Sequence, residues 1–272
     1  MEKKTSFNKF MRFFGLRPLN DINKDSLALR ERVSEGQERG QKVAFTLAEV
    51  LITIGVIGVV AAMTIPTLIA NTNGQKFRSQ FKKTISTLSQ AGRMSQAQYG
   101  FDYAGISAWG NGNANPETEK TIEALLNGTV KGTFLGMCTP KTSGYAFEGL
   151  YGTDVQLTTF GEEDMYFYQL SDGSLVGYSM GFDTNCSLTP GENLSNVSQC
   201  RGFIDVNGGT KPNKEVTCSN GTDTMFVWDE NYEDCVVKND ANHMTDIFPI
   251  VFHDSIVEPA TNAAKYVLNT AK

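Results

Sequence analysis

Apolar residues dominate positions 45–70, and a helical alternation of apolar and polar residues follows them. The apolar run of 26 residues carries a single charge, Glu49. At about 1.5 Å per residue a helix of this length reaches roughly 39 Å, which exceeds the hydrocarbon core of a bilayer, about 30 Å. The run therefore predicts a helix that can cross a membrane.

The helical pattern continues over residues 71–99. Apolar side chains recur there at helical spacing, with basic and polar residues between them: Phe77, Phe81, Ile85 and Leu88. This spacing predicts an amphipathic helix that continues the first one and turns its apolar face to a folded domain. Residues 71–74 form a weak patch, where we expect the helix to fray.

Short strands are predicted in the remainder, residues 100–272. Residues 165–170 and 174–180 are rich in β-forming side chains and flank a Ser-Asp-Gly turn, which predicts a hairpin. Other predicted elements are strands at 202–206, 224–229 and 235–238, a loop at 100–120, and short helices at 117–126 and 260–271. We therefore expect an α+β fold, in which a long amino-terminal helix packs on a small antiparallel β-sheet.

Charge separates a basic leader, residues 1–44, from an acidic body. The leader holds ten Lys or Arg against six Asp or Glu, a balance of +4, and since the whole chain is at −6 the rest is at −10. Because Lys and Arg near a membrane helix favour the cytoplasmic side, the leader should lie in the cytoplasm and residues 100–272 outside it. The acidic body argues against direct nucleic-acid binding, which uses clustered Lys and Arg.

Glu49 sets the apolar run apart from two simpler membrane segments. A secretory signal has an apolar region of about 7 to 15 residues, so this run is too long and begins too late. An ordinary anchor fits the length, but it does not explain a carboxylate inside the apolar border, where a charge is costly unless a partner or a function holds it. We therefore expect Glu49 to have a role beyond anchoring.

Residues 44–49 read Ala-Phe-Thr-Leu-Ala-Glu and resemble the type III signal of type IV pilins and of the pseudopilins of type II secretion systems. With Phe45 as the first mature residue, Glu49 is the fifth and Pro66 the twenty-second, positions at which that family carries the same residue types. The resemblance is strongest over residues 44–95. It implies that a membrane peptidase cuts between Ala44 and Phe45 and methylates the new amine of Phe45.

One residue of the signal departs from the family pattern. Ala44 stands where the family most often has glycine. Cleavage after Gly40 instead would place Glu49 ninth and leave Lys42 inside the mature helix. We therefore expect cleavage at the bond between Ala44 and Phe45.

The resemblance also implies assembly by helix packing. In the family's assembly model Glu49 of one subunit neutralises the Phe45 amine of its neighbour, and pairing of the two groups within one helix is the alternative. Gly55 and Gly58 lie on a face of small residues that lets helices approach closely, although such residues are common in any membrane helix. Pro66 removes a backbone hydrogen bond and is expected to kink or loosen the helix.

All five cysteines lie in the part expected outside the cytoplasm, where disulfides persist. Their spacing favours two local pairs, Cys186 with Cys200 and Cys218 with Cys235. Four cysteines allow three connectivities, however, so the other pairings stay open. Cys138 is expected to be the unpaired one, as a small buried residue.

A turn motif and two histidines complete the set of candidate sites. Residues 204–213, followed by Asp223, resemble a turn of bacterial pilin-like proteins, and their Asp, Asn and Gly residues suit either a plain turn or calcium. Val216 stands where a calcium loop carries its acid, which favours the plain turn.

His243 and His253 are expected at the surface or at a sheet edge. Without a C-x-x-C pair or a catalytic constellation, no metal, cofactor or enzymatic activity is expected.

These observations predict a structural subunit, pilin or pseudopilin, of a type IV pilus or a type II secretion filament. The partners that the resemblance implies are the prepilin peptidase, an inner-membrane assembly platform and other pilin-like subunits. We expect a single pass through the inner membrane with the carboxyl-terminal domain outside, and after assembly a periplasmic or cell-surface filament. The rival hypothesis is a membrane-anchored extracellular binding module whose helix is only a tether, and an anchored enzyme comes third.

Overall fold

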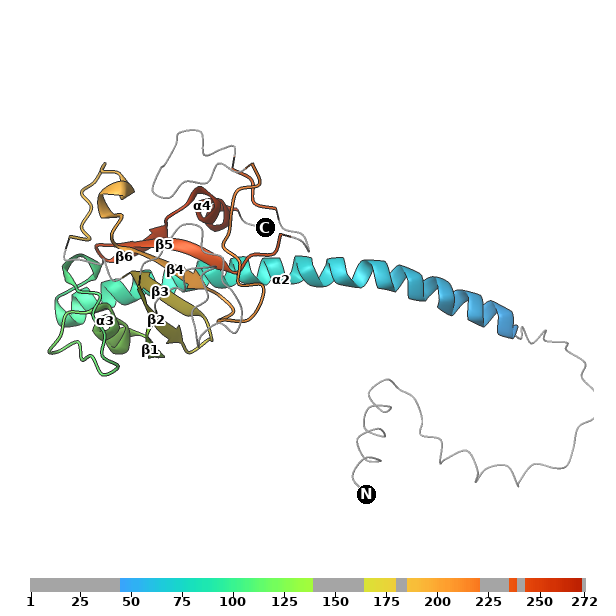
Figure 1. Cartoon of the computed structure of the whole chain (residues 1–272), viewed down its shortest axis with the longest axis horizontal. Coiled ribbons are helices and arrows are strands. Elements are labelled where there is room, and N and C mark those ends of the chain that lie inside the picture. Colours follow the sequence, from blue (N-terminus) through green and yellow to red (C-terminus); the bar gives the residue numbers. More distant parts are fainter. Residues whose placement is uncertain (1–44, 139–163, 180–184, 221–234, 239–242, 271–272) are drawn as a thin grey trace, which may run out of the picture. The chain divides into compact units, whose positions relative to one another are not determined.

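The computed structural model describes residues 45–138, 164–179, 185–220, 235–238 and 243–270 (Figure 1). The chain divides into two compact units, Met1–Thr53 and Ile54–Lys272. The described part of the first unit is the start of a helix, and the second unit contains the rest of that helix together with strands and shorter helices. The predicted α+β class is confirmed.

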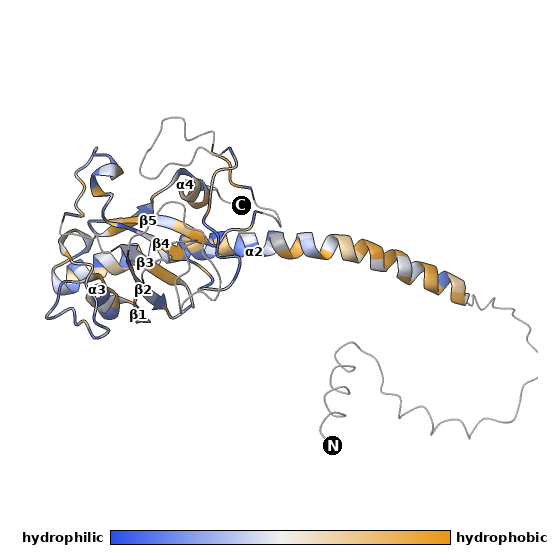
Figure 2. Cartoon of the chain, viewed as in Figure 1, coloured by the Kyte–Doolittle hydropathy of each residue, from blue (hydrophilic) through white to orange (hydrophobic). Residues whose placement is uncertain are grey.

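Helix α2 (Leu47–Tyr99) spans 53 residues and contains both predicted helical segments. It is continuous through Pro66 and through 71–74, so the expected fraying at 71–74 is wrong. Gly74 is buried, and packing of this turn offsets the weak helix propensity of its residues. The hydropathy colouring of Figure 2 changes along α2, from an apolar first half to a second half of mixed character.

The sheet of the described residues has six strands, each hydrogen-bonded antiparallel to the next one in the chain. The strands are β1 (Gly132–Cys138), β2 (Met165–Leu170), β3 (Leu175–Ser179), β4 (Arg201–Asp205), β5 (Ile247–His253) and β6 (Ile256–Pro259). The sheet is therefore an up-and-down meander, and the predicted antiparallel arrangement is confirmed.

The predicted hairpin is formed by β2 and β3. Its turn is closed by Asp172, whose carboxylate accepts hydrogen bonds from the backbone N–H and the hydroxyl of Ser174. Gly173 takes a φ of +91°, a backbone conformation that favours glycine. Tyr166 lies opposite Tyr178 across the pair, with ring centroids 5.7 Å apart. Turn chemistry and a cross-strand aromatic contact therefore act together to set the register.

Strands β1, β5 and β6 are absent from the predicted pattern. In β1 the register shifts between Phe134 and Gly136, so the alternation of the strand is broken. Every residue of β5 is buried, and the strand contains Pro249. Strand β5 therefore lacks the period-two alternation that marks a half-buried strand, and its proline argues against a strand despite its Ile, Val and Phe residues.

Residues 235–238 are irregular, so the strand predicted there is wrong. The backbone N–H of Ser219 donates to the carbonyl of Val236 at 2.8 Å, and the guanidinium of Arg78 donates to that of Val237 at 3.2 Å. A disulfide at Cys235 and a side chain from α2 hold this segment in place of a paired strand. The strand predicted at 224–229 lies outside the described residues.

Two short helices, α3 (Ile122–Thr129) and α4 (Asn262–Asn269), overlap their predicted positions. Each follows a threonine whose hydroxyl accepts a hydrogen bond from a backbone N–H in the first turn. Thr121 accepts from Ala124 at 3.0 Å, and Thr261 accepts from Ala264 at 3.2 Å. These N-caps set where both helices begin.

Side chains of α2 and of the sheet belong to one buried cluster. Phe81 stacks on Phe248 of β5 with ring centroids 4.3 Å apart. The hydroxyl of Tyr103, in the 3₁₀ helix η2 (Tyr103–Gly105), donates to the carbonyl of Leu88 at 2.8 Å. All four apolar residues of the predicted helical repeat are buried: Phe77, Phe81, Ile85 and Leu88.

Gly92 is a point of very close approach between α2 and the turn after β5. A Cβ atom there would lie 2.7 Å from Cε2 of Tyr103 and 2.9 Å from the carbonyl oxygen of Ser255. We expect Gly92→Ala to lower the free energy of unfolding by about 1 to 3 kcal/mol through overpacking, as measured by chemical denaturation of the full chain in detergent. Gly105→Ala is the control, because no neighbouring atom lies within 4 Å of its added Cβ. Unchanged stability of Gly92→Ala would contradict the close approach.

Candidate functional site

The first turn of α2 holds the charge that the sequence singles out. Oε2 of Glu49 accepts hydrogen bonds from the backbone N–H of Thr46 at 2.8 Å and from its hydroxyl at 2.9 Å. The hydroxyl of Thr46 in turn accepts from the backbone N–H of Glu49 at 3.2 Å. This reciprocal pattern is a capping box, in which two residues satisfy each other's free backbone N–H groups.

The capping box gives Glu49 a local role that the charge argument misses, although its T-x-x-E pattern is visible in residues 46–49. The donors to the carboxylate are a neutral amide and a neutral hydroxyl, so the negative charge is not cancelled. The next charged residue along α2 is Lys76. Helix capping therefore explains why an acid suits this position, but it leaves the charge without a counterion from its own helix.

Phe45, the expected first mature residue, lies just before the capping box and is 78% exposed. Its nitrogen and the Glu49 carboxylate belong to residues four positions apart at the same end of the helix. Ala44, and with it the bond expected to be cleaved, lies outside the described residues.

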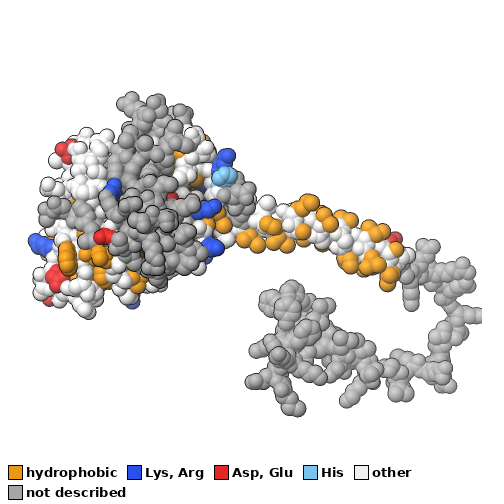
Figure 3. All heavy atoms as spheres, in the orientation of Figure 1, with side chains coloured by type: hydrophobic (Ala, Val, Ile, Leu, Met, Phe, Trp, Pro, Cys, Tyr) orange, Lys and Arg blue, Asp and Glu red, His pale blue; other side chains and the backbone are white. Residues whose placement is uncertain are grey.

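Residues 47–69 of α2 present an exposed apolar surface (Figure 3). Beside Gly55 and Gly58 no neighbouring atom lies within 4 Å of an added Cβ, so these positions are open to another helix. Pro66 lies inside this half of α2. The helix is long and apolar enough to span a membrane, which is consistent with single-pass anchoring.

Threonine hydroxyls in and just beyond this apolar half are satisfied within the helix. Each donates to a backbone carbonyl three or four residues earlier, at 2.8 to 3.0 Å: Thr53, Thr64, Thr67 and Thr72. An unsatisfied hydroxyl would be costly in hydrocarbon, where no water can bind it. The hydroxyls therefore add little cost to burial of this surface in lipid or against other helices.

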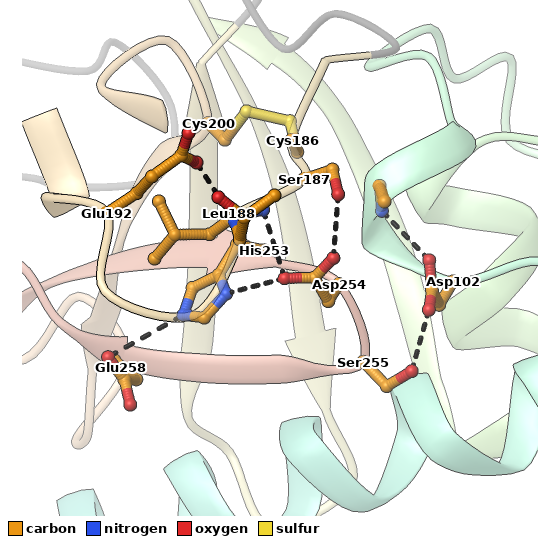
Figure 4. Close-up of polar contacts among 12 residues, drawn as sticks. Asp102, Cys186, Ser187, Leu188, Glu192, Cys200, His253, Asp254, Ser255 and Glu258 are labelled. Atoms are coloured by element: carbon orange, nitrogen blue, oxygen red, sulfur yellow. Dashed lines mark hydrogen bonds and ion pairs between the residues drawn. A yellow bond between two sulfur atoms is a disulfide. The ribbon is translucent and has the colours of Figure 1, made fainter. Parts of the chain in front are cut away.

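A second polar cluster surrounds His253 at the end of β5 (Figure 4). Nδ1 of His253 lies 3.0 Å from Oδ2 of Asp254, and Nε2 lies 3.6 Å from Oε2 of Glu258 in β6. His253 is only 5% exposed, and β5 lies between β4 and β6. The expectation of a surface or edge position is therefore wrong for His253, because the strand that carries it was not predicted. His243 is exposed, as expected.

Asp254 connects this cluster to a disulfide. Its carboxylate accepts hydrogen bonds from the hydroxyl of Ser187 at 3.0 Å and the backbone N–H of Leu188 at 3.2 Å, and its own N–H donates to the carbonyl of Cys186 at 2.9 Å. Cys186 is bonded to Cys200. The end of β5 is thereby held to the loop that this disulfide closes.

Two carboxylates on one imidazole favour its protonated form. A carboxylate only accepts hydrogen bonds, and a neutral imidazole donates from one nitrogen, so only the imidazolium can serve both contacts. Burial lowers the pKa of His253, but the charge of Glu258, 3.6 Å from Nε2, and the hydrogen bond and charge of Asp254 outweigh burial and leave the pKa raised. The contact with His253 also lowers the pKa of Glu258.

The His253 cluster differs from a catalytic triad, since Nε2 of the histidine faces a carboxylate rather than a nucleophilic hydroxyl. Beside it lies a pocket of about 630 Å³ whose lining includes Glu192, Glu258 and Lys265. The apolar part of its wall includes Leu188, Leu194, Val257 and Pro259. Pockets of this size accommodate small molecules or a side chain of another protein.

Two disulfides lie among the described residues, Cys186–Cys200 and Cys218–Cys235, with sequence separations of 14 and 17. They are the two local pairs that the cysteine spacing favours. The side chain of Cys138 is outside the part that the structure describes. Its assignment as a small buried residue therefore stays a prediction.

The turn after β4 is organised by two buried aspartates. Asp205 accepts the backbone N–H groups of residues 207–209 at 3.0 to 3.1 Å. Asp246 accepts those of Asn213 at 2.9 Å and Lys214 at 2.7 Å. Burial and the charge of Asp205 raise the pKa of Asp246 to about 7, against the effect of these hydrogen bonds. The carboxylate oxygens thus serve the backbone of a turn.

In the described ranges no group of three or more His, Cys, Asp or Glu is placed to hold a metal ion. Asp223, the far end of the turn motif, lies outside those ranges.

No protein-family model, curated protein or solved structure matches this chain. Its function is therefore inferred from its own residues and their arrangement.

The His253 cluster predicts a pH-dependent stability. Because the pKa of His253 is raised in the folded protein, its stabilisation is complete below about pH 6.5, the ordinary histidine pKa, and is lost as pH rises through the folded value. We expect His253→Gln to flatten the fall of the thermal midpoint between about pH 6 and pH 8, measured on the full chain in detergent. Asp246, whose pKa is raised from 3.8 to about 7, contributes a fall between about pH 4 and pH 7 in every variant. His243→Gln is the control, and a wild-type slope in His253→Gln would contradict the ion pairs.

Proposed function

We propose that the chain is a structural subunit, a pilin or pseudopilin, of a type IV pilus or a type II secretion filament. The observation that carries this proposal is a carboxylate at the head of an exposed apolar helix. Glu49 is capped by Thr46, but no cation of the described residues pairs with it. A charge in that position needs a partner from outside its own helix body.

Cleavage before Phe45 would supply the partner. The new amine remains able to carry a proton after methylation, and opposite charges attract more strongly at an apolar border than in water. The pair can form within one helix or between neighbouring helices. Only the second arrangement fixes the register of one subunit against the next, so it is the one that makes the charge useful for assembly.

Helix packing supplies the remaining contacts in this proposal. The exposed surface of residues 47–69 is apolar, and Gly55 and Gly58 offer places where another backbone can approach closely. Pro66 would allow local adjustment of the helix as subunits pack. The second half of α2 would carry the domain by packing on the sheet, which the stacking of Phe81 on Phe248 supports.

The partners follow from this mode of assembly. They are the prepilin peptidase, an inner-membrane assembly platform and other pilin-like subunits, without direct binding of nucleic acid. The subunit would cross the inner membrane once, with its domain outside the cytoplasm, before it enters a periplasmic or cell-surface filament. The two disulfides suit that compartment.

Two observations favour the alternative function, a membrane-anchored binding module. The capping box explains Glu49 by local structure alone. The pocket beside Glu258 could hold a ligand. In this alternative the helix is only a tether, and the domain does the recognition.

A matched pair of substitutions separates the charge of Glu49 from its capping role. Glu49→Gln removes the charge and keeps a side chain suited to the capping box, whereas Thr46→Ala removes the cap and keeps the charge. We expect Glu49→Gln to reduce incorporation into filaments at least about tenfold, because an amine would be left unpaired at the apolar border. Thr46→Ala should retain most of the incorporation.

The measurement is the fraction of the chain recovered in sheared or cross-linked filaments, with membrane insertion and processing checked in parallel. A defect in Thr46→Ala with normal assembly of Glu49→Gln would show that the cap alone matters. Normal incorporation of both variants would contradict the role of the Glu49 charge in assembly, whereas absence of the wild-type chain from filaments would favour the tether.

A further inference from the structure

The charges of α2 are distributed unevenly. After Glu49 every charged residue of the helix is a cation: Lys76, Arg78, Lys82, Lys83 and Arg93. Yet residues 45–272 together are at −10. Lys76 and Arg78 are the first of these cations beyond the apolar half of the helix, and Lys82 and Lys83 follow within the next two turns. Lys and Arg on the non-cytoplasmic flank of a membrane helix run against the usual charge bias, so their presence there calls for a specific partner.

Helix geometry sets the depth of these cations. Lys76 lies six residues beyond Ala70, the end of the apolar run, which corresponds to about 9 Å along a helix. The headgroup layer extends roughly 5 to 8 Å beyond each side of the hydrocarbon core. Long side chains on a helix lean toward its amino terminus and can reach the interface by snorkelling. The ammonium group of Lys76 therefore falls at the level of lipid headgroups.

Contacts with the domain extend this basic zone beyond the helix. Arg78 donates to the carbonyl of Val237, and Lys82 donates to that of Thr270. Lys238, next to Val237, is exposed. Figure 3 shows Lys and Arg side chains gathered where α2 leaves the domain. We call Lys76, Arg78, Lys82, Lys83 and Lys238 the basic collar.

One acid faces the collar among the described contacts. Asp172, in the β2–β3 turn, lies 3.0 Å from the ammonium group of Lys83, and both side chains are partly exposed. An exposed pair of this kind contributes little and is screened by salt. The exposed side chains of Lys76 and Lys238 make no such contact in the described part of the chain.

We infer that the basic collar binds the headgroups of anionic phospholipids and holds the base of the domain against the membrane surface before assembly. This inference rests on the membrane insertion that the proposed function includes. Its basis is charge complementarity, with Lys76 at a depth set by the helix and the other cations of the collar above it, because basic residues near an anionic surface are attracted to it. The same contacts would keep the apolar half of α2 at a fixed depth for cleavage and lateral packing.

The test uses the full chain reconstituted in vesicles of phosphatidylcholine mixed with phosphatidylglycerol. After mild detergent extraction, the ratio of the two lipids that co-purify with the protein is compared with the input. We expect the wild type to enrich phosphatidylglycerol over phosphatidylcholine. In the double variant Lys76→Gln/Lys238→Gln this enrichment should be at least about fivefold smaller. Lys120→Gln/Lys131→Gln removes two exposed cations from the flanks of α3 and should behave as wild type.

Insertion is measured in the same samples as resistance to alkaline extraction. Inserted wild type without any preference for phosphatidylglycerol would overturn this inference and leave the proposed function standing. Failure to insert would overturn both. A double variant that keeps the lipid enrichment but enters filaments poorly would show that the collar contacts the acidic body of a neighbouring subunit instead, which also overturns the lipid assignment.

Discussion

A negative charge at the head of an apolar helix is the constraint on which the rest of this molecule depends. Thr46 and Glu49 satisfy each other's backbone groups, which starts α2 cleanly at the border of the apolar run. Neutral donors do not cancel the charge, and the helix offers no cation before Lys76. A chain that only needed an anchor could begin this helix with a neutral capping residue. Retaining the acid is explained if a cation arrives from elsewhere, and the terminus that the proposed cleavage before Phe45 would create is the nearest candidate.

The two halves of α2 differ in the burial of their apolar side chains. Phe77, Phe81, Ile85 and Leu88 are buried, whereas residues 47–69 leave their apolar side chains exposed. Hydrogen bonds from Arg78 and Lys82 and the close approach at Gly92 tie the second half of the helix to the domain. The apolar half and the half packed on the domain therefore belong to one continuous helix. Within the same domain, the Cys186–Cys200 disulfide is linked to the His253 cluster through Asp254, and the Cys218–Cys235 disulfide lies next to the segment that Arg78 contacts.

The fold could be predicted where a single physical pattern dominates the sequence. The helix of residues 47–99 follows from apolar length and then from helical spacing, and the β2–β3 hairpin follows from its Ser-Asp-Gly turn. Strand β5 could not be found in this way, because it is buried at every position and so lacks alternation, and because Pro249 argues against a strand even among Ile, Val and Phe residues. His253 was misplaced for the same reason. The capping role of Glu49 could be predicted from the T-x-x-E pattern of residues 46–49. The cost of its charge in an apolar run does not by itself indicate this local role.

The amino terminus of the protein recovered from membranes tests the central claim most directly. Intact-mass and fragment-ion mass spectrometry would identify the first residue and any methyl group on its amine. A chain that begins at Phe45 with a methylated amine is the predicted result, since it supplies the cation that Glu49 requires. A membrane-bound chain that still carries residues 1–44 would contradict the account, because the charge would then have no terminus to pair with.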